Sequence, residues 1–418
     1  MQIQMGVLLF SGEGNLNPGE SMASPYLYSA HSSSGLNDLS QKLHTHIRNH
    51  ILKFPIKDKP RPVTVNTWEA IYFDHTHERL AALADAAADI GIERFVLDDG
   101  WFRGRSDDTS SLGDWYPDEE KYPNGLQPIA DYVRSKGMEF GLWVEPEMVN
   151  PKSQLYAAHP DWILHVPGRP SSLGRNQLTL DLSRADVQDY LFGVIDAVLS
   201  CGDVDYVKWD MNRTMTEVGS VLLPKARQPE TAHRYMLGLY ALLGRLMAAY
   251  PGVLFENCAS GGNRFDLGML SYMPQGWISD MCDPVGRLAI IGGASYLFPL
   301  DVMAAYIGPS PNHQNGRVSS LRTRFLAGAF CAARGVSLNE ADITAHQGEL
   351  ADWMAFAQET QSDMVGGRFD RVKKTGNQVA WQYTTRDAQT VYLAYFHILS
   401  APNMPARRAY CVGLEPTA

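Results

Sequence analysis

The chain has 418 residues, of which 45% are hydrophobic and 20% charged, as in a globular protein and unlike a disordered or fibrous one. The formal net charge is -10 and no run of lysines and arginines forms a stripe, which argues against a nucleic-acid partner. No stretch approaches the roughly 18 apolar residues of a membrane span, and the N-terminus lacks the pattern of a signal peptide. The five cysteines stand singly, so we expect free thiols and a cytoplasmic protein without a membrane partner.

Residues 1–55 differ in composition from the rest of the chain. Gly, Ser, Asn and Pro are frequent from Ser11 to Asn37, and only short extended runs such as Pro25–Tyr28 interrupt them. This composition is typical of the end of a β domain followed by a linker.

From Pro62 onward, short runs rich in β-branched and aromatic residues alternate with stretches of Ala, Leu and charged residues. This alternation is typical of repeated βα units. The stretches 77–91 and 126–136 are predicted helices, each closed by a glycine. The candidate strands are 63–68, 94–97, 139–145, 177–181, 205–210, 253–258, 276–280 and 335–339. So many units in series favour a closed (β/α)8 TIM barrel over an open doubly wound sheet.

The C-terminal part has another pattern. After a predicted helix over 347–364, the runs 379–383 and 391–395 alternate in hydrophobicity about a turn, as in an antiparallel sheet. We therefore expect an α/β protein with three parts: an N-terminal β segment with its linker (1–55), the barrel (56–365), and a small, incomplete C-terminal antiparallel β domain (366–418).

Polar and aromatic side chains gather at the C-terminal ends of the predicted strands, which in a (β/α)8 barrel meet at the face that carries the active site. They are Asp98, Asp99, Trp143, Glu145, Lys208, Asp210, Cys258 and Asp280. Carboxylates bind pairs of hydroxyls and tryptophans pack on the C–H face of a sugar ring, so the set favours a carbohydrate. Any one aspartate could instead cap a helix, and any one tryptophan could fill the core. Glycoside hydrolysis needs two carboxyl groups, whose separation decides between retention and inversion.

Strings at five places, in one order, carry a family resemblance: LDDGW (97–101), LWVEPEM (142–148), YVKWDMNR (206–213), CASGGNR (258–264) and WISD (277–280). From about residue 18 to its end, the chain resembles the α-galactosidases of glycoside hydrolase family 36. The resemblance implies a retaining hydrolase that removes terminal α-1,6-linked galactose from melibiose and raffinose-type sugars. It makes Asp210 the nucleophile and Asp280 the acid/base. Lys208 beside Asp210 would favour a carboxylate there, whereas Asp280 needs a raised pKa to carry its proton.

The same resemblance implies the contacts to the sugar. Asp98 and Asp99 are expected to hold O4 and O6 of galactose, Lys208 the ring hydroxyls, and the Cys258–Gly261 segment the C2 side. The further expected pocket residues are Trp68, Trp143, Arg175 and Asn212. The polar loop 311–317 also resembles the family and is interpreted as a structural loop.

No cofactor and no metal are expected. The pairs His44/His46 and His75/His77 lack a third ligand at suitable spacing and are predicted to be surface residues. The glycine-rich runs 260–262 and 291–293 do not form a nucleotide-binding fingerprint.

The chain departs from the family at both ends. Relatives carry a large N-terminal β-sandwich, of which only 1–55 corresponds to the last stretch, and the C-terminal β domain stops early. The family suggests a homotetramer that the sandwich helps to build, so the short front leaves the oligomeric state open. Alternative functions are a galactosyltransferase or an α-N-acetylgalactosaminidase using the same site, or a truncated, inactive galactoside-binding protein. The Cys258–Gly261 segment favours the plain galactoside, because an acetamido group needs more room near C2.

Overall fold

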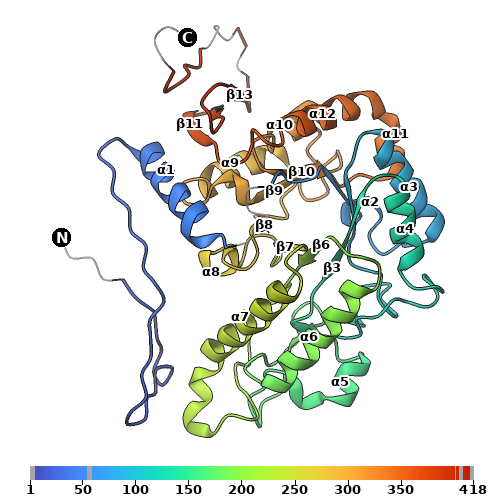
Figure 1. Ribbon diagram of the computed structural model, residues 1–418, viewed down its shortest axis with the longest axis vertical. Coiled ribbons are helices and arrows are strands. Elements are labelled where there is room, and N and C mark those ends of the chain that lie inside the picture. The colour runs from blue at the N-terminus through green and yellow to red at the C-terminus, as the bar shows by residue number, and fades with distance from the viewer. Residues whose placement is uncertain (1–4, 54–58, 401, 404–407, 415–418) are drawn as a thin grey trace.

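The computed structural model describes residues 5–53, 59–400, 402–403 and 408–414 (Figure 1). A closed barrel of parallel strands in the order β1-β10-β9-β8-β7-β6-β3-β2 forms its centre. The barrel strands are β1 Thr64–Asn66, β2 Arg94–Leu97, β3 Glu139–Val144, β6 Tyr206–Trp209, β7 Leu254–Asn257, β8 Gln275–Trp277, β9 Met303–Ile307 and β10 Ala333–Val336. The predicted (β/α)8 TIM barrel is therefore confirmed.

Helices surround the barrel and fill the connections between its strands (Figure 1). The longer ones are α3 His77–Asp89, α4 Gln127–Ser135, α6 Ala185–Ser200, α7 Thr231–Ala249, α9 Pro284–Ala294 and α12 Gln347–Glu359. The shorter ones are α2 Trp68–Ile71, α5 Gln154–Ala158, α8 Leu267–Leu270, α10 Leu321–Leu326 and α11 Glu340–Ala345. None of the helices in the described part of the chain is long and apolar enough to cross a membrane.

The predicted fourth barrel strand, 177–181, is wrong. Its residues Leu178–Thr179 (β5) pair antiparallel with Met148–Val149 (β4), outside the barrel. Strand β3 pairs directly with β6, and the eighth strand of the barrel is β9, between β8 and β10, which the sequence analysis did not predict. Strand β9 lies in a long apolar stretch that follows α9, and periodicity alone does not distinguish a short buried strand from a buried helical segment. Between β3 and β6 the chain thus leaves the barrel over residues 145–205, an excursion that carries β4, α5, β5 and α6.

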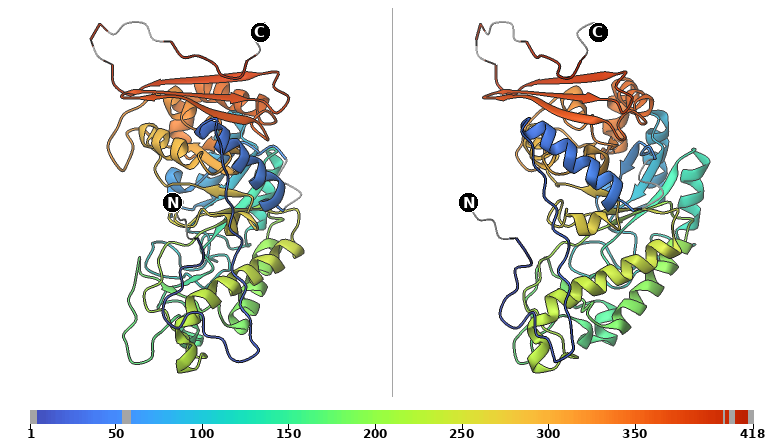
Figure 2. Two further views of the ribbon diagram at one scale, coloured as in Figure 1. Left: turned by 90° about the vertical axis from the view of Figure 1, so that its left-hand side faces the viewer. Right: turned by 60° about the vertical axis from the view of Figure 1, so that its left-hand side comes forward.

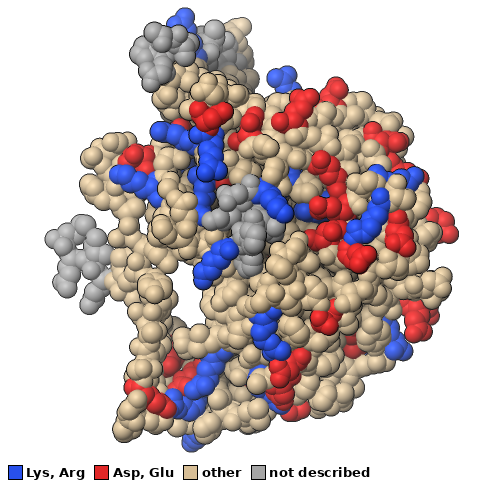
Figure 3. Space-filling model, viewed as in Figure 1, with Lys and Arg blue, Asp and Glu red and all other residues tan. Residues whose placement is uncertain are grey.

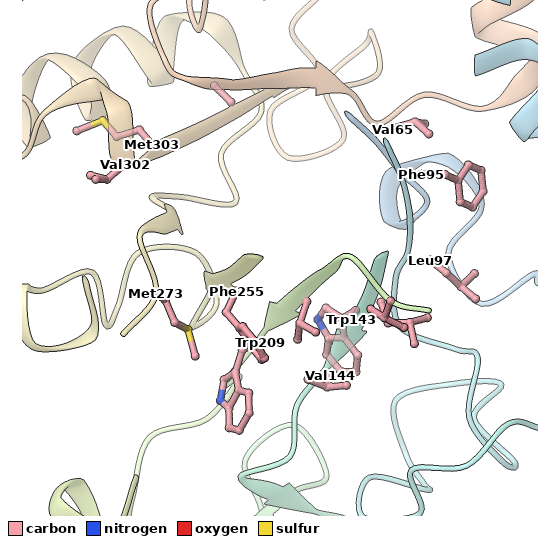
Figure 4. Packing of buried hydrophobic residues seen from close by; sticks show 14 of the residues in the cluster. Val65, Phe95, Leu97, Trp143, Val144, Trp209, Phe255, Met273, Val302 and Met303 are labelled. Carbon is pink, nitrogen blue, oxygen red and sulfur yellow. The ribbon is translucent and has the colours of Figure 1, made fainter. Parts of the chain in front are cut away.

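The core consists of the barrel interior and the layer between strands and helices (Figure 4). Strand β2 is buried along its whole length, as expected of a parallel strand that is covered on both faces. Helix α3 buries Leu80, Leu83, Ala84 and Ala87, a spacing that forms one apolar stripe. The strands are therefore held rigidly from both sides, which fixes the positions of the side chains at their ends.

An antiparallel sheet of β11 Arg368–Thr375, β12 Gln378–Thr384 and β13 Val391–His397 lies at one end of the molecule (Figure 2). This sheet confirms the predicted C-terminal antiparallel structure. A helix that was not predicted, α1 Leu36–His46, contacts both this sheet and the end of α9. The Gln41 side chain donates to the Phe369 carbonyl at 2.8 Å, and the Ser40 hydroxyl donates to the Tyr296 carbonyl at 3.0 Å. The division of the chain into 1–55, 56–365 and 366–418 stays a prediction.

The described residues before α1 contain no helix or strand. They run along the molecule to the 3-10 helix Lys225–Glu230 that precedes α7, where Glu20 pairs with Arg227 at 3.0 Å. Helix α1 continues into a π-helical turn, Ile47–Ile51. On the face shown in Figure 3, positive and negative side chains are intermingled over the helices.

Candidate active site

The carboxyl ends of the barrel strands open into one cavity of about 930 Å³, its mouth included. All the candidate residues of the sequence analysis except Glu145, Cys258 and Gly261 line it: Trp68, Asp98, Asp99, Trp143, Arg175, Lys208, Asp210, Asn212 and Asp280. The strand register explains part of this grouping, since Trp143 on β3 lies beside Lys208 on β6, which lies beside Glu256 on β7.

Asp210 is buried at the end of β6 and receives hydrogen bonds at both carboxylate oxygens. The side chains of Asn212 and Trp143 donate to Oδ2 at 2.8 and 3.1 Å. The backbone amides of Met211 and Ser260 donate to Oδ1 at 2.8 and 3.3 Å. The carboxylate is thus fixed in one orientation by charge-assisted hydrogen bonds before any ligand enters.

Lys208 and Asp98 form an ion pair inside the cavity. The ammonium donates to Asp98 Oδ2 at 2.9 Å, and the Asn66 amide donates to the same oxygen at 2.6 Å. Burial disfavours the charged form of Lys208, but the charges of Asp98 and Asp210 raise its pKa well above the usual value. The direct partner of Lys208 is therefore Asp98, and Lys208 acts on Asp210 through its charge.

Asp99 is held by a buried arginine that sequence reasoning missed. Arg105 Nε and Nη2 donate to the two carboxylate oxygens of Asp99 at 2.9 and 2.8 Å. Burial raises the pKa of Asp99, and the charge of Arg105 opposes this rise. Arg105 lies in an irregular loop after β2, where no periodic pattern marks it as buried.

Asp280 follows β8 and lines the mouth of the cavity. The Trp277 indole donates to its Oδ1 at 2.9 Å. Desolvation of the carboxyl raises the pKa of Asp280; the charge of Lys208 opposes this, and that of Asp210 adds to it. Asp210 and Asp280 therefore line one cavity in different environments. The Asp210 carboxylate accepts several hydrogen bonds, whereas burial favours the protonated form of Asp280.

Cys258 and Gly261 lie behind the cavity wall. Cys258 is buried in a cluster with Trp277 and Tyr306, and burial raises the pKa of its thiol well above the usual value. Gly261 has a φ of +82° and packs against the backbone of Ser279 and Asp280. Both residues thus support the loops that carry the carboxyl groups.

Arg175 reaches the cavity from the tip of a tight turn in the excursion between β3 and β6. Gly174 and Gln177 exchange backbone hydrogen bonds across it. Arg175 and Asn176, the two central residues, have φ values of +50° and +61°. This two-residue turn with both central φ values positive normally favours Asn and Gly, so Arg175 occupies a strained backbone position.

A second layer of carboxyl groups lies under the cavity. Glu145 is fully buried and accepts hydrogen bonds from the backbone and side chain of Asn212. Burial, together with the charge of Asp210, raises the pKa of Glu145 to about 8, although the Asn212 hydrogen bonds oppose the rise. Glu147 accepts from the Trp209 indole at 2.8 Å and pairs with Arg264. This layer holds Asn212 and Trp209, the neighbours of Asp210, in place.

Comparison with known proteins identifies the family. The family model described as Melibiase matches residues 21–367. The chain belongs to the Melibiase family. Its relatives include the α-galactosidase AgaA of Geobacillus stearothermophilus, which is 45% identical over 99% of this chain and 57% of the relative. Another is α-galactosidase 1 of Pediococcus pentosaceus, which is 40% identical over 100% of this chain and 57% of the relative.

Crystal structures of AgaA variants share the fold of this Melibiase chain. The variant in complex with stachyose superposes with a TM-score of 0.93 at 45% identity, over 96% of this chain and 56% of the other. The variant in complex with raffinose superposes with a TM-score of 0.90 at 46% identity, over 92% and 54%. Both are described as GH36 α-galactosidases, so the resemblance to that family is confirmed. The chain spans about half the length of the relatives it matches.

Several cavity residues of this Melibiase chain escaped the sequence analysis. They are Asn66, Glu69, Glu256, Cys282, Tyr306, His313, Gln314 and Ser337. The loop 311–317 was interpreted as structural, whereas the structure places His313 and Gln314 at the cavity. The missing signal was β9, because a loop is recognised as part of the active-site face only when the strand before it is known.

In the described ranges, no group of three or more His, Cys, Asp and Glu side chains is arranged to hold a metal ion. The prediction that His44 and His75 are surface residues is wrong. His44 is buried with Nε2 2.9 Å from the Ser295 carbonyl, and His75 is buried with Nδ1 3.2 Å from the Tyr122 hydroxyl. Burial lowers the pKa of His44 to about 4 and that of His75 to about 3, so both serve as neutral core residues.

Proposed function

We propose that the chain is a retaining α-galactosidase that hydrolyses terminal α-1,6-linked galactose from melibiose and raffinose-type oligosaccharides. The observation that carries this proposal is the pair Asp210 and Asp280 in one cavity, with the opposite environments that a nucleophile and an acid/base need. The names of the relatives support it, as do the AgaA structures in complex with raffinose and stachyose.

In the proposed first step, an Asp210 oxygen attacks C1 of galactose while Asp280 gives its proton to the glycosidic oxygen. The C1–O bond breaks, the rest of the sugar leaves as an alcohol, and a β-galactosyl ester forms on Asp210. In the second step, Asp280 takes a proton from a water molecule that attacks C1 and breaks the ester. Galactose leaves with its α configuration retained, and both carboxyl groups return to their starting states.

The proposed galactose contacts follow the cavity wall. Asp98 and Asp99, oriented by Lys208 and Arg105, accept hydrogen bonds from the O4 and O6 hydroxyls, and Lys208 donates to ring hydroxyls. Arg175, Asn212, Trp143 and Trp68 complete the wall. We propose that Cys258 and Gly261 shape the C2 side from behind this wall. A cytoplasmic location is supported by the five free cysteines, and the oligomeric state stays a prediction.

The test is nitrophenol release from para-nitrophenyl α-galactoside by the purified chain. The Asp210→Ala variant is expected to lose about 10³-fold or more in kcat on this substrate. On raffinose, whose sugar leaving group needs the proton, Asp280→Ala is expected to lose about 10²- to 10⁴-fold. A folded wild-type chain that binds galactose without hydrolysing it would instead support the galactoside-binding alternative. Faster release from the 2-acetamido glycoside, or galactose transfer in preference to hydrolysis, would support the other enzymes.

Azide separates the roles of the two carboxyl groups. With an activated aryl galactoside, Asp280→Ala should form α-galactosyl azide, because azide attacks the ester on Asp210 without needing a base. Asp210→Ala should form β-galactosyl azide, because azide enters where the Asp210 carboxylate was. NMR of the products distinguishes the two anomers, and the opposite pattern would exchange the two assignments.

A further inference from the structure

The turn 174–177, which brings Arg175 to the cavity, needs support from outside itself. Arg175 and Asn176 both have positive φ values, and for arginine this conformation costs free energy. A strained backbone of this kind persists only where the surrounding structure fixes it. Arg175 is exposed at the cavity rim, so its own side chain supplies no such packing. The contacts made to the backbone of the turn therefore decide where its guanidinium lies.

Asn150 makes one of these contacts. It directly follows β4, is fully buried, and donates from Nδ2 to the Asn176 carbonyl at 2.7 Å. Its Oδ1 accepts from the Leu112 amide at 2.7 Å, and its own backbone amide donates to the Leu112 carbonyl at 3.0 Å. Because a backbone amide only donates and a carbonyl only accepts, both ends of the Asn150 side-chain amide are fixed. Asn150 thus ties the turn to the buried loop after β2.

Arg213 contacts the residues that flank the tip of the turn. Its Nη1 donates to the carbonyls of Ser172 and Gln177 at 3.1 and 2.6 Å. Arg213 is only partly buried, whereas Asn150 is enclosed on all sides. The contact from Asn150 is therefore the one that a rigid part of the molecule makes to the central residues of the turn.

We propose that Asn150 is a positioning residue that holds the turn 174–177, and with it Arg175, at the cavity. The inference rests on the proposed function, in which Arg175 contacts galactose. It implies that a change at Asn150 weakens substrate binding through Arg175, while the carboxyl groups that carry the chemistry keep their places. The effect should therefore fall on KM and spare kcat.

The kinetic test uses Asn150→Asp, which keeps an acceptor for the Leu112 amide but loses the donor to the Asn176 carbonyl. KM for para-nitrophenyl α-galactoside is expected to rise about three- to tenfold, with kcat within about threefold of wild type. In the Arg175→Asn background, the same substitution should change KM by less than about twofold, because the side chain through which it acts is gone.

An equal increase of KM in both backgrounds overturns the inference. Asn150 Oδ1 also lies 3.5 Å from Nη1 of Arg105, the residue that holds Asp99. A KM effect that persists without Arg175 would mean that Asn150 acts through this second route. A fall in kcat with an unchanged KM would likewise contradict the proposed role.

Trypsin gives a readout that does not depend on activity. Arg175 is exposed, and the nearby Arg169 precedes Pro170, where trypsin does not cut. Cleavage after Arg175 is expected to be at least about fivefold faster in Asn150→Asp than in the wild-type chain. Cleavage after Arg386, in the exposed turn between β12 and β13, should keep its rate. An unchanged rate at Arg175, measured by mass spectrometry of the fragments, overturns the inference.

Asn37→Asp is the matched control. The Asn37 side chain donates to the Arg371 carbonyl at 3.3 Å and accepts from the Arg371 amide at 3.2 Å, at the C-terminal sheet. This variant should leave KM and the trypsin rate at Arg175 unchanged.

Urea unfolding shows whether Asn150→Asp folds. If it has no cooperative transition, Asn150→Ser takes its place in each measurement, because serine adds no buried charge and is too short to reach the Asn176 carbonyl. A wild-type chain that does not cleave the galactoside contradicts the proposed function, whereas the trypsin rates still decide the inference. The two failures are therefore distinct.

Discussion

Gly261 meets the backbone of Asp280 without room for a side chain. A Cβ atom on Gly261 would lie 2.7 Å from the Asp280 amide nitrogen and 2.8 Å from Ser279 Cα. Its φ of +82° also suits glycine better than any L residue. The loop after β7 thus packs directly against the backbone of the proposed acid/base.

We therefore predict that Gly261→Ala displaces Asp280 and lowers kcat/KM by about 10- to 100-fold. Gly293→Ala in α9 is the control, because a Cβ there meets no atom within 4 Å. The control should keep full activity and gain up to about 1 kcal/mol of stability, since alanine favours helix. Steady-state kinetics and urea unfolding of both variants test this, and wild-type kcat/KM in Gly261→Ala would refute it.

A substitution of Arg175 is expected to affect protein stability and substrate binding in opposite directions. Asparagine tolerates a positive φ better than arginine, so Arg175→Asn should leave the free energy of unfolding unchanged or raise it by about 0.5–1 kcal/mol. It should also raise KM for galactosides about tenfold, because a donor that lines the cavity is lost. Thermal unfolding and kinetics measure the two effects. An unchanged KM would show that Arg175 does not contact the substrate.

Glu145 predicts a pH dependence of stability. Its pKa is about 8 in the folded chain against an ordinary value of 4.5, so between these pH values the folded state holds a proton that the unfolded state releases. Stability therefore falls as pH rises through this window, on the order of 1 kcal/mol per pH unit. Glu145→Gln does not titrate and should become progressively more stable than the wild-type chain from pH 5 to pH 8.

Urea unfolding at several pH values checks the Glu145 prediction. The substituted amide can donate to Gln177 Oε1, a buried atom without a hydrogen-bond partner in the described part of the chain. The exposed Glu78→Gln variant should follow the wild-type curve at every pH. A constant difference between Glu145→Gln and the wild-type chain across this range would contradict the prediction.

Trp143 tests the hydrogen bonds to the proposed nucleophile. Trp143→Phe keeps a buried aromatic ring but removes the donor to Asp210 Oδ2, so kcat should fall about tenfold, as expected for a bond to a charged group. Trp115→Phe is a matched control. Its ring packs 6.1 Å from that of Trp143, and its buried Nε1 has no partner within the described ranges. Its kcat should stay within about twofold of wild type, whereas equal losses in both variants would indicate a packing effect.

The fold was predictable where the sequence marks the two ends of a strand with polar residues. Strands β2 and β6 are short runs bounded by polar residues, and their positions agree with the prediction. Strand β9 lies in a mostly apolar stretch after α9, in which a short strand and a buried helical segment have the same pattern, so the sequence analysis missed it. The short run at β5 has strand character, but only the three-dimensional pairing with β4 reveals that it lies outside the barrel.

The site was predictable where a side chain directly follows a recognised strand. Asp98, Lys208 and Asp210 are of this kind, and the structure brings them into one cavity. Arg105 and His313 lie in irregular loops, and their positions depend on how those loops fold back over the barrel. No periodic pattern in the excursion between β3 and β6 indicates its tight turn, and Arg175 was expected at the cavity from the family resemblance alone.

The cavity residues come from two kinds of structure, the barrel strands and that excursion. Asp210 and Asp280 follow strands of the closed barrel, whereas Arg175 belongs to a segment that leaves the barrel and returns to it at β6. A change in the turn 174–177 alters the cavity rim without touching the strands that carry the carboxyl groups, or Glu145 and Glu147 at the start of the excursion. This turn is therefore a place where the shape of the cavity rim can diversify, in evolution or in the laboratory, while the residues around the proposed nucleophile stay unchanged.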